Sequence, residues 1–212
     1  MKTLLPFDAY SINNLCDHLA ENDVDLENII RQYGYPPFWS RKSSFETLVH
    51  IILEQQVSLA SAKAALLKLK KKIGAITPGK LLELSDAELR ACYFSRQKTE
   101  YVRCLAEAIQ NKKLDIIKLQ NLDNEAIRAQ LTCIKGIGQW TVDVYLMMVL
   151  HRTDLFPAGD IALINSAKHV KRLPVKTSKE EIWQIAEQWR PYRTVAAFLL
   201  WHAYIKRKNL CS

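Results

Sequence analysis

Glycine and proline are scarce in this sequence, and regular β patterning is lacking. The 212 residues include six glycines and seven prolines, while long segments are rich in alanine, leucine, lysine and glutamate. No segment alternates apolar and polar residues for long enough to predict a strand, and no internal repeat is visible. The sequence therefore predicts an all-α protein, long enough to bury a core as one domain or as two closely joined lobes.

Closely spaced metal ligands and long apolar runs are also lacking. The five cysteines are scattered without CxxC spacing: Cys16, Cys92, Cys104, Cys133 and Cys211. An odd number of dispersed cysteines is typical of free thiols in a reducing compartment. The first residues, interrupted by Pro6 and Asp8, do not read as a signal peptide, and no run approaches the ~18 apolar residues of a membrane span. We therefore expect a soluble intracellular protein, in the cytoplasm or nucleoid, or in a eukaryotic nucleus.

Acidic residues are outnumbered by basic ones. The chain has 30 Lys and Arg against 22 Asp and Glu, which gives a net charge of +8 and an isoelectric point near 9.2. Residues 161–212 alone hold ten basic and three acidic side chains, a net +7, and residues 57–80 hold six lysines and no acid. This distribution suits a polyanionic partner, although basic composition alone also fits two solvated helix faces.

Capping residues and apolar spacing locate two helices in the first half of the chain. The serines at 43 and 44 precede a helix at 45–54, and Ser58 precedes another at 59–73. Between them lies Gln55-Gln56-Val57. A glutamine pair in this place is expected at a solvated helix end.

The most informative stretch is LTCIKGIGQWTVDVYLMMVLHRTDLFPAGD, residues 131–160. Residues 125–133 have helical spacing, Gly136 and Gly138 interrupt it, and residues 139–150 predict a second, strongly apolar helix. A Walker phosphate loop and a dinucleotide-binding fingerprint are both excluded, because Gly-Lys-Ser/Thr is missing and a helix precedes the turn. Two interpretations remain: a glycine-capped αα-corner, or a helix-hairpin-helix whose main-chain N–H groups face a phosphate of nucleic acid.

The residues after the turn favour the second interpretation. The hairpin and the FPAGD loop that ends on Asp160 resemble the core signature of the helix-hairpin-helix DNA glycosylases, and within that superfamily the DNA-3-methyladenine glycosylase II branch. Two further segments agree: ILEQQVSLASAKAAL at 52–66 and WRPYRTVAAFLLW at 189–201. The resemblance spans residues 45–201 and therefore covers most of the chain.

The resemblance implies an all-α, two-lobed fold with the active-site cleft between the lobes. One lobe would combine residues 1–42 with 161–212. The other, residues 43–160, would carry the helix-hairpin-helix at 125–150 and the catalytic loop at 154–160. We expect a compact form that lacks the N-terminal mixed domain of the bacterial prototype of this branch.

Asp160 is the candidate catalytic residue. An aspartate directly before a helix is among the commonest N-caps, so capping alone would explain it. The two roles are compatible, because capping N–H groups and the positive helix end favour the ionised carboxylate. A fixed carboxylate stabilises the positive charge that develops on deoxyribose as the base departs. Asp143 falls inside the second hairpin helix and Asp154 precedes the loop, so Asp160 is the convincing carboxylate.

The resemblance implies a base pocket with aromatic walls. Trp140 and Tyr192 match the positions of these walls, and such rings attract a cationic base by cation–π contact worth about 0.5–2 kcal/mol. Periodicity alone fits a core aromatic at Trp140 as well. Strand-cleaving relatives carry a lysine in place of Trp140, which implies that this enzyme is monofunctional. Val144 stands where the prototype has a tyrosine, which leaves the range of bases open.

The resemblance also implies the contacts with DNA. Gln56 would fill the gap left by an extruded nucleotide, and Lys135 would clamp a phosphate together with the hairpin N–H groups. The expected DNA-binding residues are Gln56, Lys135, Gly136, Ile137, Gly138 and Thr141. In the family, the carbonyls that match Thr132, Ile134 and Ile137 hold a monovalent cation. No other cofactor is expected, because the iron–sulfur cluster of some relatives needs four closely spaced C-terminal cysteines and only Cys211 lies near the end.

These features lead to one functional prediction and two alternatives. We expect a monomeric DNA glycosylase that excises alkylated, cationic purines such as 3-methyladenine and 7-methylguanine from double-stranded DNA and leaves an abasic site. O-glycosidases generally use two carboxylates, and a single one suits a base that leaves without protonation. The alternatives are a non-catalytic helix-hairpin-helix DNA-binding protein and a helical interaction protein whose glycine turn is merely a corner.

Overall fold

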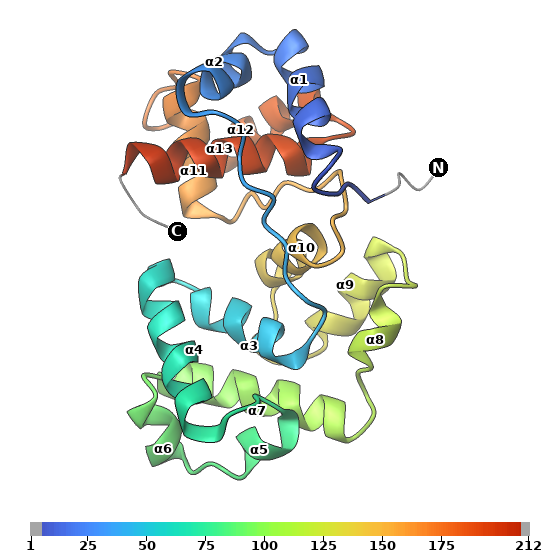
Figure 1. Ribbon diagram of the computed structural model, residues 1–212, viewed down its shortest axis with the longest axis vertical. Coiled ribbons are helices and arrows are strands. Elements are labelled where there is room, and N and C mark those ends of the chain that lie inside the picture. The colour runs from blue at the N-terminus through green and yellow to red at the C-terminus, as the bar shows by residue number, and fades with distance from the viewer. Residues whose placement is uncertain (1–5, 209–212) are drawn as a thin grey trace. The chain divides into compact units, whose positions relative to one another are not determined.

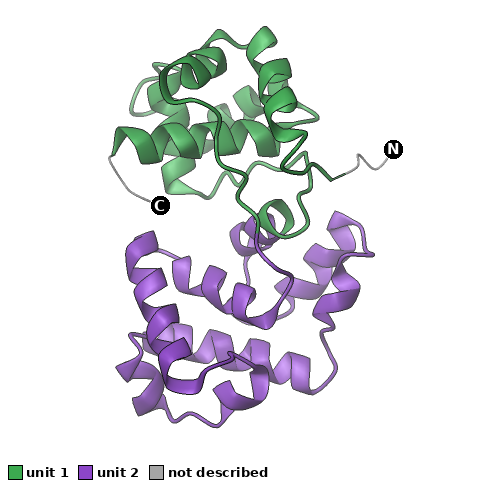
Figure 2. Ribbon diagram, viewed as in Figure 1, with its two compact units in different colours: residues 1–40, 146–212 green, residues 41–145 purple. Residues whose placement is uncertain are grey.

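The computed structural model describes residues 6–208, and this part of the chain is all-helical, as the sequence predicts (Figure 1). Within these residues it forms thirteen α-helices, one short 3-10 helix and no strand. The chain divides into two compact units (Figure 2). Unit 1 consists of residues 1–40 and 146–212, and unit 2 consists of residues 41–145.

Unit 1 is built around α13 (Arg193–Arg207), whose residues from 193 to 203 are all buried. A helix that is buried on every side lies at the centre of its core. The other elements of the unit are α1 (Ile12–Asn22), α2 (Val24–Tyr33), α11 (Ile161–Val170), α12 (Lys179–Ala186) and the 3-10 helix η1 (Glu187–Trp189). Since α1, α2 and α11 all contact α13, segments from both ends of the chain form this core.

Unit 2 is organised around α3 (Phe45–Glu54), eight of whose ten residues are buried. It packs against α4 (Leu59–Ile73) and α7 (Arg96–Gln110). The remaining helices are α5 (Pro78–Leu82), α6 (Asp86–Ala91), α8 (Ile116–Leu119), α9 (Asn124–Thr132) and α10 (Gln139–Met148), the last of which continues into unit 1. The glycine turn between α9 and α10 therefore belongs to unit 2.

Serine caps fix where α3 and α4 begin. The hydroxyl of Ser44 accepts the N–H of Thr47, and that of Ser58 accepts the N–H of Ser61, both at 3.2 Å. Each cap satisfies one of the N–H groups that a helix start leaves without an intrahelical partner. Both helices begin and end at the residues that the sequence predicts.

The second boundary between the units differs from the sequence-based division, which assigned residues 146–160 to the central lobe. The structure assigns them to unit 1. Thr194 of α13 holds this segment: its N–H donates to the Thr153 carbonyl at 2.9 Å, and its hydroxyl donates to the Arg152 carbonyl at 2.6 Å. The Leu155 N–H donates in turn to the Thr194 hydroxyl at 3.1 Å. These hydrogen bonds join residues about forty positions apart, so the local sequence does not indicate which unit the segment belongs to.

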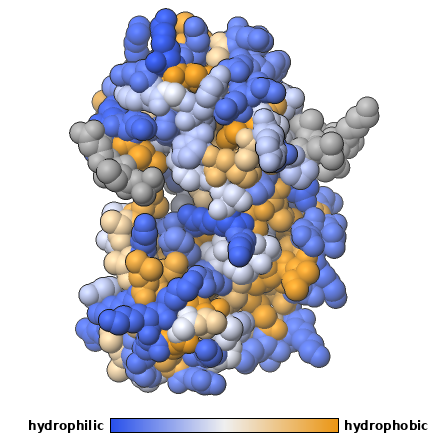
Figure 3. Space-filling model, viewed as in Figure 1, coloured by the Kyte–Doolittle hydropathy of each residue, from blue (hydrophilic) through white to orange (hydrophobic). Residues whose placement is uncertain are grey.

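The described thiols are free, as their scattered spacing predicts: Cys16, Cys92, Cys104 and Cys133. Burial raises the pKa of Cys16 to about 12, so this thiol stays protonated. Cys211 lies outside the described residues. No helix within residues 6–208 is both long and apolar enough to cross a membrane. Hydrophilic side chains cover much of the face drawn in Figure 3.

Candidate functional site

The two glycines of the turn between α9 and α10 are required for different reasons. Gly136 has a φ of +91°, and a Cβ placed on it would lie 2.0 Å from Cγ of Tyr101. Only glycine adopts this conformation freely and leaves room for the α7 side chain. A Cβ placed on Gly138 meets nothing within 4 Å. The fold therefore requires glycine at position 136. At position 138 the fold has room for a side chain, and glycine leaves that space open.

Gln55 fastens the loop between α3 and α4 to this glycine turn. Its side-chain N–H₂ donates to the Gly136 carbonyl and to the Thr141 hydroxyl, both at 2.9 Å. Thr141 is only 1% exposed and its hydroxyl accepts from Gln55, so its side chain lies inside the unit. Its role as a DNA-binding residue stays a prediction. The local sequence does not distinguish Gln55 from Gln56. Gln55 is half-buried, and a half-buried amide needs polar partners, but its burial is known only from the tertiary structure.

Gln56, the predicted filler of the gap in DNA, lies next to this anchor. Its side chain is exposed, and its backbone has a left-handed φ of +57°. A non-glycine residue in this region costs free energy, and such strain is concentrated at functional sites. Because Gln55 is fixed to the glycine turn, the exposed Gln56 has a defined position relative to that turn.

The side chains of Lys135 and Ile137 differ in exposure. The Lys135 ammonium pairs with the Glu100 carboxylate, and this hydrogen bond raises the pKa of Lys135. An exposed ion pair of this kind stabilises little, so the ammonium is readily transferred to another anion. Ile137 is 4% exposed, and its N–H donates to the Ile134 carbonyl at 3.0 Å. Ile137 thus closes the turn, while Lys135 lies on its surface.

The carbonyls of Thr132, Ile134 and Ile137 lie at and beyond the C-terminal end of α9. Helix C-termini carry partial negative charge and leave carbonyls without intrahelical partners. The Ile134 carbonyl accepts one N–H and retains a second lone pair. These oxygens fit the chemistry of a monovalent cation. Within residues 6–208 no group of three or more His, Cys, Asp or Glu could hold a metal ion, so backbone oxygens would have to supply the ligands.

In unit 1, Asp160 is the N-cap of α11, as the sequence predicts. Its Oδ1 accepts the N–H of Leu163 at 2.8 Å and the indole N–H of Trp201 at 3.2 Å. Trp201 comes from α13, so the FPAGD loop and the central helix of the unit meet at this carboxylate oxygen. Two N–H donors on one oxygen fix the orientation of the carboxylate.

Trp201 is a site residue that sequence analysis missed. It is 8% exposed and lies in an aromatic cluster, with its ring centroid 6.4 Å from that of Trp39 and 6.0 Å from that of Phe198. A buried indole usually finds an acceptor for its N–H. That rule indicates that Trp201 needs a partner, but the identity of the partner depends on the tertiary structure.

The two other aspartates near the loop are engaged by arginines. Asp154 Oδ1 accepts from Arg193 at 2.6 Å, and Asp143 Oδ1 accepts from Arg128 at 2.6 Å. Arg193 is itself 8% exposed, so the first pair is a buried structural contact just before the FPAGD loop.

Trp140 and Tyr192, the predicted walls of the base pocket, are both half-buried. Trp140 lies in the first turn of α10, in unit 2. Tyr192 is the N-cap residue of α13, in unit 1, and its ring packs edge-on against His18 at 5.6 Å. Val144 is 2% exposed and belongs to the core. The joint role of the two rings stays a prediction.

Comparison with known proteins gives consistent matches. Residues 49–191 match a family described as the HhH-GPD superfamily base excision DNA repair protein, a span that includes both the glycine turn and Asp160. DNA-3-methyladenine glycosylase 1 of Schizosaccharomyces pombe is 31% identical over 191 residues, which cover 87% of this chain and 84% of that protein.

Two solved structures have a similar fold. The S. pombe 3-methyladenine DNA glycosylase in complex with abasic DNA superposes with a TM-score of 0.82 at 29% identity, covering 89% of this chain and 95% of that one. The DNA-3-methyladenine glycosidase of Bacillus halodurans gives a TM-score of 0.72 at 29% identity, covering 97% and 94%. The similarity in each case extends over nearly the whole of both chains.

Proposed function

The chain belongs to the HhH-GPD superfamily of base excision DNA repair proteins, and we propose that within it the protein is a monofunctional glycosylase for cationic alkylated purines in double-stranded DNA. The observation that carries the proposal is the fixed carboxylate of Asp160, which ends the FPAGD loop and receives the N–H groups of Leu163 and Trp201. Relatives named as 3-methyladenine glycosylases support the class of substrate.

In the proposed reaction, Asp160 acts by electrostatic stabilisation. Breaking the bond between base and deoxyribose builds positive charge on the sugar, and an oriented carboxylate lowers the free energy of that state. A base that is already cationic takes the bonding electrons without needing a proton from the enzyme. Asp160 can also orient the water that attacks the sugar. Trp140 cannot form the Schiff base that a lysine would form, so the strand stays intact.

Unit 2 is proposed to bind the phosphates of DNA. The open space outside Gly138 lets a phosphate approach the backbone of the turn at the start of α10, where the helix dipole favours an anion. Lys135 would exchange Glu100 for a phosphate, and the exposed Gln56 would take the place of the extruded nucleotide. Thr132, Ile134 and Ile137 would hold a monovalent cation through their carbonyls, adding positive charge beside the phosphate.

The reaction type is tested by incubating the protein with methylated duplex DNA and identifying the released bases by chromatography. We expect 3-methyladenine and 7-methylguanine, with faster release than for a neutral lesion such as hypoxanthine, and an unbroken strand with an abasic site. Sodium borohydride should trap no covalent complex, because Trp140 replaces the lysine of strand-cleaving relatives. A trapped complex would refute the monofunctional assignment, and faster release of hypoxanthine would refute the cation–π argument.

Trp201→Phe should lower kcat roughly tenfold, or about 1.4 kcal/mol, while leaving the DNA dissociation constant unchanged. The variant keeps an aromatic ring in the cluster but removes the N–H that Asp160 accepts. Single-turnover base release and a DNA titration measure the two quantities separately.

Trp39→Phe is the matched control for this variant. Its ring centroid lies 5.2 Å from that of Phe198, in the same aromatic cluster, and the substitution changes packing in a similar way. We expect Trp39→Phe to keep a near-normal kcat. Equal losses in the two variants would mean that Trp201 acts through packing alone and not through its hydrogen bond.

A further inference from the structure

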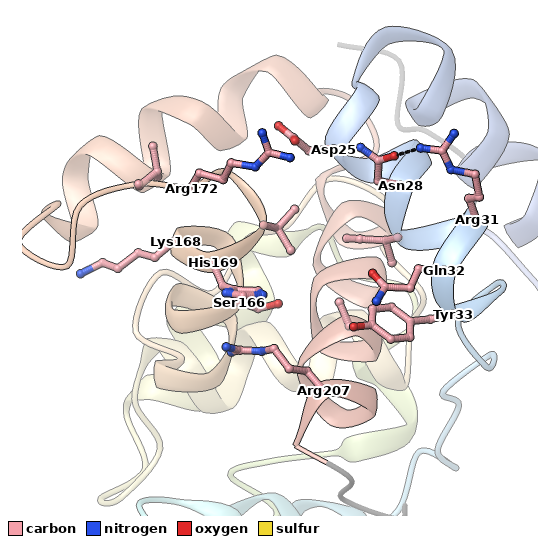
Figure 4. Close-up of a pocket in the computed structure, with 14 residues that line it drawn as sticks. Asp25, Asn28, Arg31, Gln32, Tyr33, Ser166, Lys168, His169, Arg172 and Arg207 are labelled. Carbon is pink, nitrogen blue, oxygen red and sulfur yellow. Dashed lines mark hydrogen bonds between the residues drawn. The ribbon is translucent and has the colours of Figure 1, made fainter.

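Unit 1 contains a cavity that takes no part in the proposed reaction. It has a volume of about 690 Å³ and lies among α2, α11, α13 and the turn after α11 (Figure 4). This volume is in the range of small-molecule sites, which measure about 300–1,000 Å³. None of the residues assigned to the glycosylase reaction lines it.

The lining of this cavity is strongly basic. Its cationic or potentially cationic side chains are Arg31, Lys168, His169, Arg172 and Arg207, and its one acidic side chain is Asp25. The Asp25 carboxylate is already paired with Lys171 at 3.1 Å, and the Lys168 ammonium donates to the Val175 carbonyl at 2.7 Å. A neutral carbonyl leaves the charge of Lys168 in place, so the positive charge of the lining comes from this ammonium and from three guanidinium groups.

These guanidinium groups differ from the other well-placed arginines of the chain. Arg41, Arg128 and Arg193 each form an ion pair with a carboxylate at 2.6–2.7 Å. Within residues 6–208, none of the three arginines at the cavity forms an ion pair with an acidic side chain. All three arginines are exposed, and Arg31 donates to the Asn28 side-chain oxygen. Like charges that line one cavity repel one another, so an anion from solution would lower the free energy of this arrangement.

The geometry of the cavity concentrates hydrogen-bond donors. Figure 4 shows Arg172, His169 and Arg207 along one side and Gln32 and Tyr33 on the other, while Lys168 points away. Arg172 has a left-handed φ of +52°, the conformation with which helices commonly end, and it directly follows the C-cap of α11. Burial, and then the charge of Arg207, lower the pKa of His169, so its ring is neutral and has one N–H to donate.

Helix dipoles explain only part of this arrangement. Arg31 and Arg207 lie in the last turns of α2 and α13, where a cation complements the negative end of the helix. Arg172 lies beyond the C-cap of α11 and is not part of a helix turn. The helix dipole explains why one cation lies at the C-terminal end of each helix. It does not explain why three guanidinium groups line the same cavity.

We propose that this cavity binds a phosphomonoester or pyrophosphate group carried by a nucleotide-sized ligand. A guanidinium presents a planar fork of donors that matches phosphate oxygens, and a phosphomonoester carries about −1.5 to −2 charges at neutral pH. A phosphodiester carries only one negative charge, so a phosphomonoester suits this concave basic site better. The group can belong to a free nucleotide or to the 5′-phosphate end of a DNA strand.

The test is calorimetric titration of the whole protein at constant ionic strength, because screening would otherwise change with the added salt. Inorganic pyrophosphate and adenosine 5′-monophosphate should bind, and adenosine should not. Arg172→Gln and Arg207→Gln should each weaken pyrophosphate binding at least tenfold. Lys206→Gln is the matched control, since it removes the same charge from α13 at an exposed residue that does not line the cavity, and it should bind like the wild type.

Duplexes with a 5′-phosphate or a 5′-hydroxyl separate the two sources of the phosphate group. A preference for the phosphorylated duplex that Arg172→Gln removes would assign the site to a DNA end, and monophosphate binding without that preference would assign it to a free nucleotide. Both outcomes support the site. Failure of the wild type to bind pyrophosphate at millimolar concentration, or equal weakening in Lys206→Gln, would overturn it. Base release serves as an independent readout, because these variants should keep it.

Discussion

Replacement of Asp160 by asparagine is expected to abolish base release while leaving folding and DNA binding intact. Asparagine is as good an N-cap as aspartate, so the Leu163 N–H keeps its acceptor at the start of α11. What is lost is the negative charge that stabilises the sugar cation. Electrostatic contributions of this kind are worth about 3–4 kcal/mol, or a factor of roughly 10²–10³ in kcat. Single-turnover release of 3-methyladenine measures the effect.

Asp115→Asn is the matched control for this variant. Asp115 is the N-cap of α8 and accepts the N–H of Ile117 at 3.1 Å, so the same substitution tests capping without the proposed chemistry. We expect it to release base at the wild-type rate. Near-normal turnover in a folded Asp160→Asn protein would remove Asp160 from the mechanism, whatever the control does.

Gly136→Ala should destabilise the protein by about 2–6 kcal/mol. The new methyl group would lie 2.0 Å from Cγ and 2.5 Å from Cβ of Tyr101, atoms near the backbone of α7 that cannot swing away. Overpacking typically costs about 1–3 kcal/mol, and a side chain held at positive φ costs a further 1–3 kcal/mol. Urea unfolding measures the change. A stability within 0.5 kcal/mol of the wild type would contradict the close contact with Tyr101.

Gly138→Ala is the complementary variant, because its methyl group enters open space. We expect it to fold with a stability within about 0.5 kcal/mol of the wild type and to bind duplex DNA at least tenfold more weakly, since the methyl group keeps a phosphate away from the turn. Affinity should also fall steeply with salt, as phosphate neutralisation releases counterions. Wild-type affinity in Gly138→Ala would mean that no phosphate approaches the turn there.

Much of the helical structure could be predicted from local sequence. Helix α11 begins directly after Asp160, and its bounds of 161–170 agree with the sequence pattern. Helix α10 begins at Gln139 as expected but ends at Met148, two residues before the predicted end. Ends like this are less predictable than starts, because side-chain caps mark a helix start in the sequence more often than they mark its end.

The candidate site could be predicted only in part. The FPAGD loop and the glycine turn were recognisable because short-range features define them, and they directed attention to Asp160 and Gly136. The DNA contact expected at Thr141 stays a prediction, and its side chain lies inside the unit. Its position two residues into the hairpin helix gave no indication that it faces inward, towards Gln55. Lys135 pairs with Glu100, which lies in α7, and the sequence around Lys135 does not indicate this partner.

Local sequence was sufficient for the helical class, the start of the second hairpin helix, the capping aspartate and the family. These depend on periodicity, capping and turn chemistry, which act over a few neighbouring residues. Helix packing was needed to bring Gln55 to the glycine turn, 81 residues away along the chain, and Trp201 to Asp160, 41 residues away. Hydrogen bonds over such separations depend on how helices pack, and packing leaves no pattern in the spacing of neighbouring residues.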